Sequence, residues 1–171
     1  MKSDSGWEDV YLSLGTNVGD RLHWLEKAVN ALREEEGISV DELSSVFETQ
    51  PLELEDQPLF LNMVVACSTS LAPEELLDAV KDIETRLGRV KRRPKGAREI
   101  DIDIILYGEV VIESDHLSIP HPRFHERKFV LVPLSHIAPE LESPVHGKTV
   151  TELLDECPDD SYIHLYEHLM V

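Results

Sequence analysis

Two aspartates, Asp101 and Asp103, alternate with isoleucines in the segment at residues 98–104. In a strand, successive side chains point to opposite faces, so both carboxylates leave one face with their Cα atoms about 6.7 Å apart. Carboxylate oxygens are ligands that Mg²⁺ prefers, and Mg²⁺ is usually held by one or two carboxylates together with substrate phosphates. An exposed strand whose acids discourage edge pairing is the other interpretation, and the strand alone does not choose between them.

A basic segment immediately before these aspartates favours phosphate chemistry. Seven of the chain's 16 Lys and Arg residues fall within it, with no acidic residue among them. They are Arg86, Arg89, Lys91, Arg92, Arg93, Lys95 and Arg98. Guanidinium groups bind phosphate oxygens in bidentate geometry, and a metal neutralises the remaining charge. The pattern therefore indicates a triphosphate site, with a solvated basic turn as the alternative.

A proline-bounded loop at residues 120–128 combines imidazole and guanidinium groups and is a second candidate for phosphate binding. The spacing of the histidines in and before this loop matches no closed zinc motif. Residues 146–149 resemble the end of a P-loop, but the earlier glycine that this motif requires is replaced by Glu142. No nucleophile motif is present, so covalent catalysis has no support in the sequence.

Composition limits the class of protein. A chain of 171 residues with 42% hydrophobic content fits one domain, expected to span residues 1–171. A net charge of −18 argues against generic nucleic-acid binding, which needs a basic surface. The two cysteines fit no disulfide framework or zinc spacing, and no apolar run is long enough to cross a membrane. We expect a soluble, monomeric, cytoplasmic protein.

Hydrophobic periodicity and turn residues predict alternating strands and helices. The elements in order are a strand at 10–14, a helix capped by Asp20, a strand at 38–47, a strand at 60–67, a helix opening at Pro73, and a strand at 100–106. This order is typical of an α+β, ferredoxin-like fold, in which helices cover one face of an antiparallel sheet. A C-terminal extension follows, with a short helix opened by Thr149 and Glu152. The other side of the sheet, or its loops, is then available for ligands.

Four motifs occur in order along the chain and carry a family resemblance. They are YLSLGTN at 11–17, DQPLFLN at 56–62, REIDIDI at 98–104 and IPHP at 119–122. Over residues 10–141 the chain closely resembles the 6-hydroxymethyl-7,8-dihydropterin pyrophosphokinases. The resemblance implies a ferredoxin-like fold and transfer of pyrophosphate from ATP to a reduced pterin alcohol in folate biosynthesis, giving AMP and the pterin diphosphate.

The same resemblance implies the site residues. Asp101 and Asp103 would bind two Mg²⁺ ions bridging the ATP phosphates, and Arg89 and Arg98 would stabilise charge on the moving phosphoryl group. The implied ATP-binding residues are Glu84, Arg89, Arg98, Ile104, His121 and Arg127. The implied pterin-binding residues are Thr49, Leu52, Phe60, Asn62 and Phe129.

These pterin assignments make physical sense, since a flat heterocycle with polar edges binds between stacking partners and a few fixed polar groups. Core packing remains the plain interpretation of Phe60 and Phe129, and a strand-end hydrogen bond that of Asn62. Two other functions also stay open. A two-carboxylate nucleotidyltransferase would release pyrophosphate instead of AMP, and a noncatalytic ferredoxin-like module would bind a small ligand without chemistry.

Overall fold

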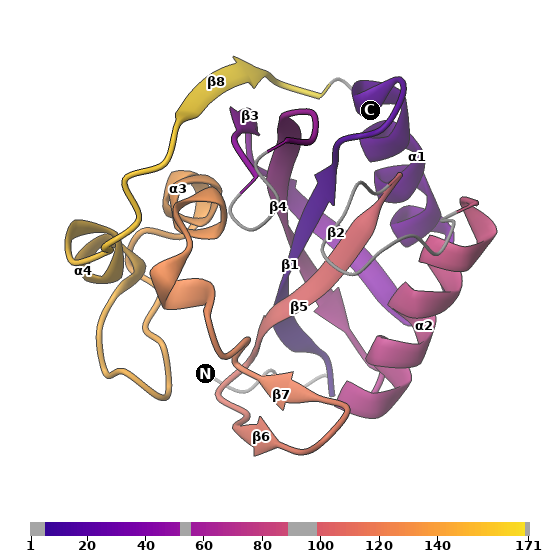
Figure 1. Cartoon of the computed structure of the whole chain (residues 1–171). Helices are drawn as coiled ribbons and strands as arrows, with labels where there is room; N and C mark the ends of the chain where they lie inside the picture. Colours follow the sequence, from indigo (N-terminus) through magenta and orange to yellow (C-terminus); the bar gives the residue numbers. More distant parts are fainter. Residues whose placement is uncertain (1–5, 52–55, 89–98, 170–171) are drawn as a thin grey trace.

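A six-stranded antiparallel sheet forms the centre of the molecule in a computed structural model that describes residues 6–51, 56–88 and 99–169 (Figure 1). Its strands run in the order β5-β1-β4-β3-β8, and β2 pairs with β4 beside β3. The strands are β1 (Glu8–Thr16), β2 (Ile38–Leu43), β3 (Val46–Thr49), β4 (Phe60–Thr69), β5 (Asp101–Tyr107) and β8 (Ile163–Glu167). Two short strands, β6 (Ile112–Glu113) and β7 (Ser118–Ile119), pair with each other.

One face of the sheet is covered by α1 (Arg21–Glu34) and α2 (Pro73–Arg86), which lie together on one side of Figure 1. The Asp20 side chain accepts a hydrogen bond from His23 N, and Pro73 is the first residue of α2, as the sequence predicts. The apolar stripes of both helices are buried against β1, β4 and β5. This is the larger hydrophobic core.

The C-terminal extension covers part of the other face. It supplies α3 (Lys128–Ile137), α4 (Val150–Asp155) and a 3₁₀ turn, η1 (Phe124–Glu126). A second apolar cluster joins these helices to β4 and β5. Thr149 and Glu152 form the predicted capping box at the start of α4. The ligand-accessible part of this face is therefore the portion that α3 and α4 leave uncovered.

The βαββαβ order and the antiparallel sheet confirm the predicted ferredoxin-like arrangement, with two differences. The single strand expected at 38–47 is divided into β2 and β3, because Ser44 turns its hydroxyl to accept a hydrogen bond from Val64 N at 2.8 Å. The strand β8, which pairs with β3 at the edge of the sheet, was not anticipated. Four of its five residues are exposed, so its sequence carries no buried alternation.

Candidate active site

The two aspartates lie on β5 as the alternation predicts. Ile102 and Ile104 are buried in the core beneath α1 and α2, whereas Asp101 and Asp103 are half-buried on the opposite face. The pairing of β5 with β1 shifts register at Ile105, whose side chain then packs in the second apolar cluster. The carboxylates therefore project from the face of the sheet that carries the second apolar cluster, opposite to the face covered by α1 and α2.

Burial and mutual repulsion perturb this acidic pair. The pKa of Asp103 is raised to about 7, first by burial and then by the negative charge of Asp101. Glu84 raises this pKa further, while the cationic groups of Lys81 and Arg127 oppose the shift. A cation placed between the two carboxylates would offset this repulsion, and this suits a divalent metal site.

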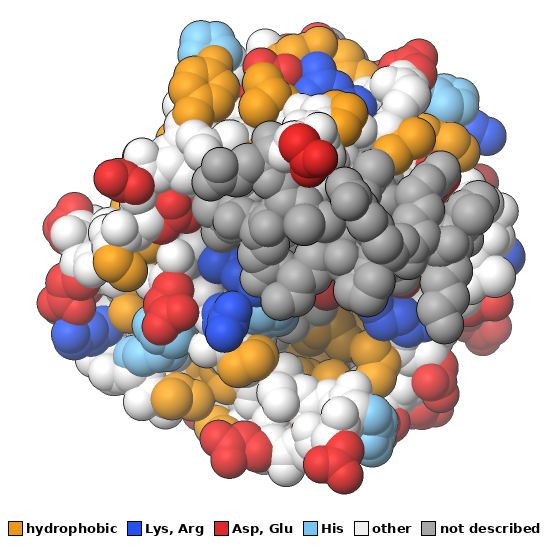
Figure 2. Space-filling model, in the orientation of Figure 1, with side chains coloured by type: hydrophobic (Ala, Val, Ile, Leu, Met, Phe, Trp, Pro, Cys, Tyr) orange, Lys and Arg blue, Asp and Glu red, His pale blue; other side chains and the backbone are white. Residues whose placement is uncertain are grey.

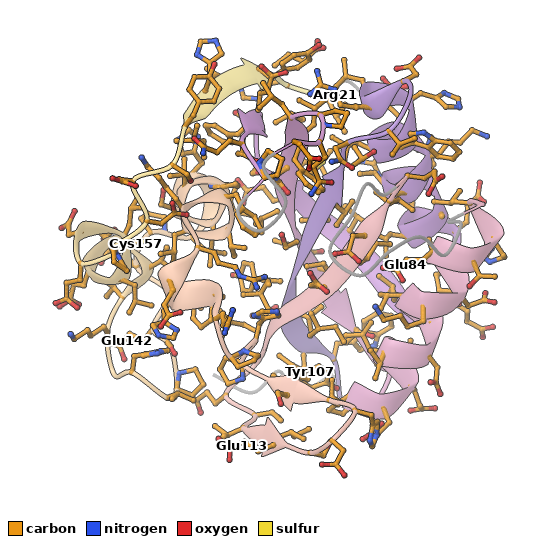
Figure 3. The ribbon with its side chains drawn as sticks, in the orientation of Figure 1. Arg21, Glu84, Tyr107, Glu113, Glu142 and Cys157 are labelled. Atoms are coloured by element: carbon orange, nitrogen blue, oxygen red, sulfur yellow. The ribbon has the colours of Figure 1, made fainter. Side chains whose placement is uncertain are left out.

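Glu84 fixes the start of β5 from α2. Only 2% of it is exposed, and its Oε2 atom accepts a hydrogen bond from Ile102 N at 2.7 Å. Its other oxygen lies 3.4 Å from Lys81 Nζ. Figure 3 shows Glu84 between α2 and β5. Because the Ile102 peptide lies between the two aspartates, this hydrogen bond positions both of them.

His121 is held against β5 in its neutral form. Its backbone N–H donates to Ile105 O at 2.9 Å, and its Nδ1 atom accepts from Arg123 N at 3.2 Å. Burial, then the charge of Arg127, lowers the pKa of His121 to about 4, with Asp101 opposing the shift. Since Nδ1 accepts a hydrogen bond, the proton of the neutral ring lies on Nε2, which is then a donor for a ligand oxygen.

A row of paired residues connects the acidic pair to the β3–β4 side of the sheet. Gly15 on β1 is the pairing partner of both Asp101 on β5 and Asn62 on β4, and Asn62 also pairs with Phe47 on β3. Paired residues share a face, so the Asp101 and Asn62 side chains leave the sheet on the same side, two strand spacings or about 10 Å apart. A Cβ atom at position 15 would lie only 2.7 Å from Asn62 Oδ1, so glycine leaves room for the Asn62 side chain on this face of the sheet.

The polar groups on the β3–β4 side satisfy one another. Asn62 Nδ2 donates to Thr49 Oγ1 at 2.6 Å, and the two residues are 4% and 2% exposed. Phe60, the pairing partner of Thr49, is half-buried. Phe129 on α3 is also half-buried, with the Arg127 guanidinium 5.6 Å from its ring centroid. Phe60 and Phe129 are thus both partly exposed, as aromatic rings that stack on a planar ligand must be.

Two residues that the sequence analysis did not select hold the segment leading into β4. Asn17 Nδ2 donates to Gln57 Oε1 at 2.9 Å and to Pro58 O at 3.1 Å. Arg21 donates to Leu59 O at 2.9 Å and forms an ion pair with Glu48 at 2.8 Å. The position of Asn17 within the first motif was the available signal, but nothing in the sequence identified its partners.

Several predicted residues are not placed at the site. Arg89, Arg98 and Leu52 lie outside the described residues. Ile104 points its side chain into the core, so a contact with a nucleotide would involve only its backbone. Arg86, from the basic segment, forms ion pairs with two acidic residues, Glu35 at 3.0 Å and Asp82 at 2.8 Å.

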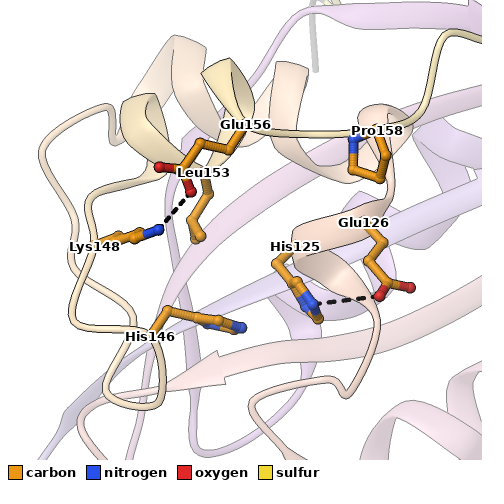
Figure 4. A pocket seen from close by; sticks show the side chains of 7 residues that line it. All are labelled: His125, Glu126, His146, Lys148, Leu153, Glu156 and Pro158. Atoms are coloured by element: carbon orange, nitrogen blue, oxygen red, sulfur yellow. Dashed lines mark hydrogen bonds and ion pairs between the residues drawn. The ribbon is translucent and has the colours of Figure 1, made fainter.

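A separate pocket of about 310 Å³ lies between η1 and α4 (Figure 4). It is lined by His125, Glu126, His146, Lys148, Leu153, Glu156 and Pro158. The His125 and His146 rings lie with their centroids 4.4 Å apart and their planes tilted by 43°, and Lys148 pairs with Glu156 at 2.6 Å.

Nowhere in the described part of the chain do three or more His, Cys, Asp or Glu side chains form a group able to hold a metal. A cation at Asp101 and Asp103 would therefore need ligands from a substrate or water.

Acidic side chains are spread over much of the visible surface in Figure 2, in keeping with the net charge. Among the described residues, no helix has both the length and the apolar character needed to span a bilayer.

Comparison with known proteins shows the family of the chain. Residues 11–139 match the family model for 7,8-dihydro-6-hydroxymethylpterin-pyrophosphokinase. The chain is 45% identical over 133 residues to the Bacillus subtilis protein named 2-amino-4-hydroxy-6-hydroxymethyldihydropteridine pyrophosphokinase, covering 78% of this chain and 80% of that one. It is 43% identical over 157 residues to the folic acid synthesis protein fol1 of Schizosaccharomyces pombe, covering 92% of this chain and 21% of the relative.

The chain thus spans about a fifth of the length of the fol1 relatives. Among solved structures, wild-type Plasmodium falciparum HPPK-DHPS with pteroate has the same fold, with a TM-score of 0.72 at 16% identity over 88% of this chain and 44% of that one. Both the extent of the family match and the identity to the Bacillus subtilis protein are decisive. The chain belongs to the 7,8-dihydro-6-hydroxymethylpterin-pyrophosphokinase family.

Proposed function

We propose that this chain transfers pyrophosphate from ATP to 6-hydroxymethyl-7,8-dihydropterin in folate biosynthesis, giving AMP and the pterin diphosphate. The observation that carries the proposal is the row Asp101, Gly15 and Asn62 on three adjacent strands. It puts a pair of carboxylates and a neutral amide on one face, about 10 Å apart. A pterin recognised at Asn62 would extend its hydroxymethyl group toward a phosphate chain held at β5.

The described residues fit a Mg²⁺ site, because Asp101 and Asp103 are close enough to raise the pKa of Asp103 and offer only hard oxygen ligands. These two side chains would hold the two Mg²⁺ ions expected in this family, with ATP oxygens completing the coordination. Bound Mg²⁺ would neutralise negative charge on the triphosphate. Glu84 would keep the aspartates in register through Ile102 N.

The nucleotide would be bound by one neutral donor and several cations. His121 Nε2–H would donate to a phosphate or ribose oxygen, and Arg127, which lies close enough to lower the His121 pKa, would supply positive charge. Arg89 and Arg98 would stabilise the charge that develops on the transferred group. Positioning and charge stabilisation supply most of the acceleration in phosphoryl transfer, so no covalent intermediate is required.

The pterin would be held by hydrogen bonds and stacking. The Asn62 amide, already oriented by Thr49, would meet the polar edge of the ring. Phe60 and Phe129 would cover its two faces, and the backbone near Thr49 and Leu52 would complete the pocket. In-line attack of the hydroxymethyl oxygen on the β-phosphorus then releases AMP, with Asp101 beside the attacking hydroxyl.

We place this reaction in the cytoplasm, since both cysteines are free thiols. Cys67 is buried, and burial, followed by the charge of Asp41, raises its pKa to about 12. A thiol of this kind is not readily oxidised.

The test is an assay with ATP, Mg²⁺ and the reduced pterin alcohol, in which AMP and pyrophosphate are both measured. AMP formed in equal amount to the pterin diphosphate supports the proposal. Release of pyrophosphate would instead indicate a nucleotidyltransferase. Folded protein that releases neither product would point to a ligand-binding module.

A further inference from the structure

The C-terminal segment at residues 159–168 contacts both sides of the proposed pterin pocket. At its beginning, Asp159 Oδ2 accepts a hydrogen bond from Lys128 N at 3.0 Å. Lys128 is the first residue of α3 and directly precedes Phe129. Its ammonium group also donates to Ser161 O at 3.3 Å. The segment therefore holds the backbone that carries one aromatic wall of the pocket.

Asp159 is well suited to this position. Partial burial acts to raise its pKa, but hydrogen bonds from Ser161 and from Lys128 N outweigh that effect and leave the pKa below its ordinary value. A carboxylate at the first backbone N–H of a helix also interacts favourably with the helix dipole. The N-terminus of α3 has no capping side chain from its own N-cap residue, Arg127, so Asp159 supplies this role from a distance in the sequence.

At its other end, the segment forms β8 and holds the opposite wall. Thr49, which binds the Asn62 amide, pairs with Ile163. The next residue, Gln50, is joined to Tyr162 twice: its N–H donates to Tyr162 O at 3.3 Å, and its Oε1 accepts from Tyr162 N at 2.8 Å. These contacts lie next to Thr49, one of the implied pterin-binding residues.

Two further contacts hold β8 beyond the Gln50–Tyr162 hydrogen bonds. The Ser45 hydroxyl lies 3.0 Å from His168 Nδ1, at the far end of β3. The Arg21 guanidinium lies 5.5 Å from the Tyr166 ring centroid while it also binds Glu48 and Leu59 O. Arg21 thus connects β8 to the end of β3 at Glu48 and to the residue before β4, Leu59.

We infer that residues 159–168 form a strap that sets the spacing of the two walls of the pterin pocket, with Asp159 and Gln50 as positioning residues at its two attachments. This inference rests on the proposed function. Among the described interactions the strap has no direct contact with the β5 aspartates or His121, so it acts mainly on pterin binding. Its Asp159 attachment lies next to Arg127, a proposed ATP-binding residue, whereas its Gln50 attachment does not.

The test measures KM for the pterin alcohol and for ATP separately in the full-length chain. Asp159→Ala removes the first attachment, and Gln50→Ala removes the side-chain hydrogen bond of the second while the backbone N–H at this position still donates to Tyr162 O. We expect the pterin KM to rise about tenfold in Asp159→Ala and about threefold in Gln50→Ala. The ATP KM and kcat should stay within about twofold of wild type in Gln50→Ala, and in Asp159→Ala the ATP KM should rise clearly less than the pterin KM. Asp160→Ala, at the exposed neighbouring position, is the matched control and should match wild type.

A double variant distinguishes a strap from two local contacts. If the two attachments act through one strap, then Asp159→Ala and Gln50→Ala together raise the pterin KM by clearly less than the product of the single effects. Equal increases in the pterin and ATP KM values, or full additivity, would overturn the inference.

Conservative variants keep the test decisive if an alanine variant does not fold. Asp159→Asn and Gln50→Glu each retain an acceptor oxygen, so their pterin KM should lie closer to wild type than that of the alanine variants. Wild-type protein that forms no AMP would contradict the proposed function. Active wild type together with folded Asp159→Ala of unchanged pterin KM would contradict only the strap.

Discussion

The two ends of the site share one face of the sheet but are stabilised in opposite ways. On β5, Asp101 and Asp103 repel each other, and the pKa of Asp103 is raised to about 7. On β3 and β4, Thr49 and Asn62 are neutral, nearly fully buried and joined by a 2.6 Å hydrogen bond. The β5 end thus destabilises the fold in the absence of a bound cation, whereas the side chains at the β3–β4 end are already held by their own hydrogen bond.

This contrast separates function from stability. At the acidic end, the residues proposed for phosphate chemistry lower the stability of the ligand-free fold, as is common where charges are kept for catalysis. At the neutral end, the residues that would recognise the pterin also contribute to packing. Substitutions at the two ends should therefore change the free energy of unfolding with opposite signs, while both impair activity.

The largest effect is expected from Asp103→Asn, which removes a proposed metal ligand. Turnover should fall at least about a thousandfold, since the charge stabilisation supplied by bound metal is lost. The same change should stabilise the metal-free protein at pH 8 by roughly 1–3 kcal/mol, because a carboxyl whose pKa is raised on folding destabilises the folded state above that pKa. AMP assays and urea unfolding in chelator measure the two quantities.

Asp115→Asn, at an exposed position in the β6–β7 connection, is the control and should change neither quantity. A loss of stability in Asp103→Asn would contradict the proposed difference between the two ends.

Asn62→Ala tests the neutral end. It removes the amide proposed to read the pterin edge and leaves the buried Thr49 hydroxyl without that donor. We expect the pterin KM to rise roughly 10- to 100-fold and the stability to fall by about 1–3 kcal/mol, with the ATP KM unchanged. Steady-state kinetics and thermal unfolding provide the measurements. Asn30→Ala, exposed on α1, is the matched control, and an equal rise in the ATP KM would argue against this assignment.

The sequence predicted the acidic end more directly than the neutral end. Alternation with isoleucines was enough to assign Asp101 and Asp103 to one face, because a strand has a fixed period. The pterin-binding residues came only from the family resemblance, and their roles stay a prediction. Sequence patterns are local, so they did not reveal that Arg21 and Asn17 bind carbonyl groups 38 and 41 residues away.

The strand β8 was missed for a related physical reason. Only Ile163 in this strand is even half-buried, so the hydrophobic pattern that marks a core strand is absent. Its pairing depends on backbone hydrogen bonds to β3, which any residue type can form. The division of the 38–47 strand depends on a single serine hydroxyl, Ser44, and no periodicity reports such a contact.

Gly15→Ala tests the boundary between the two ends. The added Cβ would lie 2.7 Å from Asn62 Oδ1, and the Asn62 side chain cannot move without losing its hydrogen bond to Thr49. We expect a loss of about 1–3 kcal/mol in stability and a higher pterin KM. In an Asn62→Ala background the contact is gone, so the same substitution should cost clearly less. Identical losses in both backgrounds, measured by urea unfolding, would show that the close approach is unimportant.

The smallest effect concerns the pH dependence of stability in the metal-free protein. The pKa of His121 falls from 6.5 to about 4 on folding, so its contribution to stability is complete above pH 6.5 and is lost as the pH falls toward 4. Asp103, with its raised pKa, acts in the opposite direction over the same range. Wild type should lose stability through His121 as the pH falls from 7 to 5. His121→Gln should lose about 1 kcal/mol less over this range, after allowance for solvent screening. Urea unfolding at pH 5, 6 and 7 in chelator measures this difference.

Adding Asp103→Asn to His121→Gln should remove most of the remaining pH dependence from these two groups. Parallel profiles of stability against pH for wild type and His121→Gln would contradict a neutral, buried imidazole beside β5.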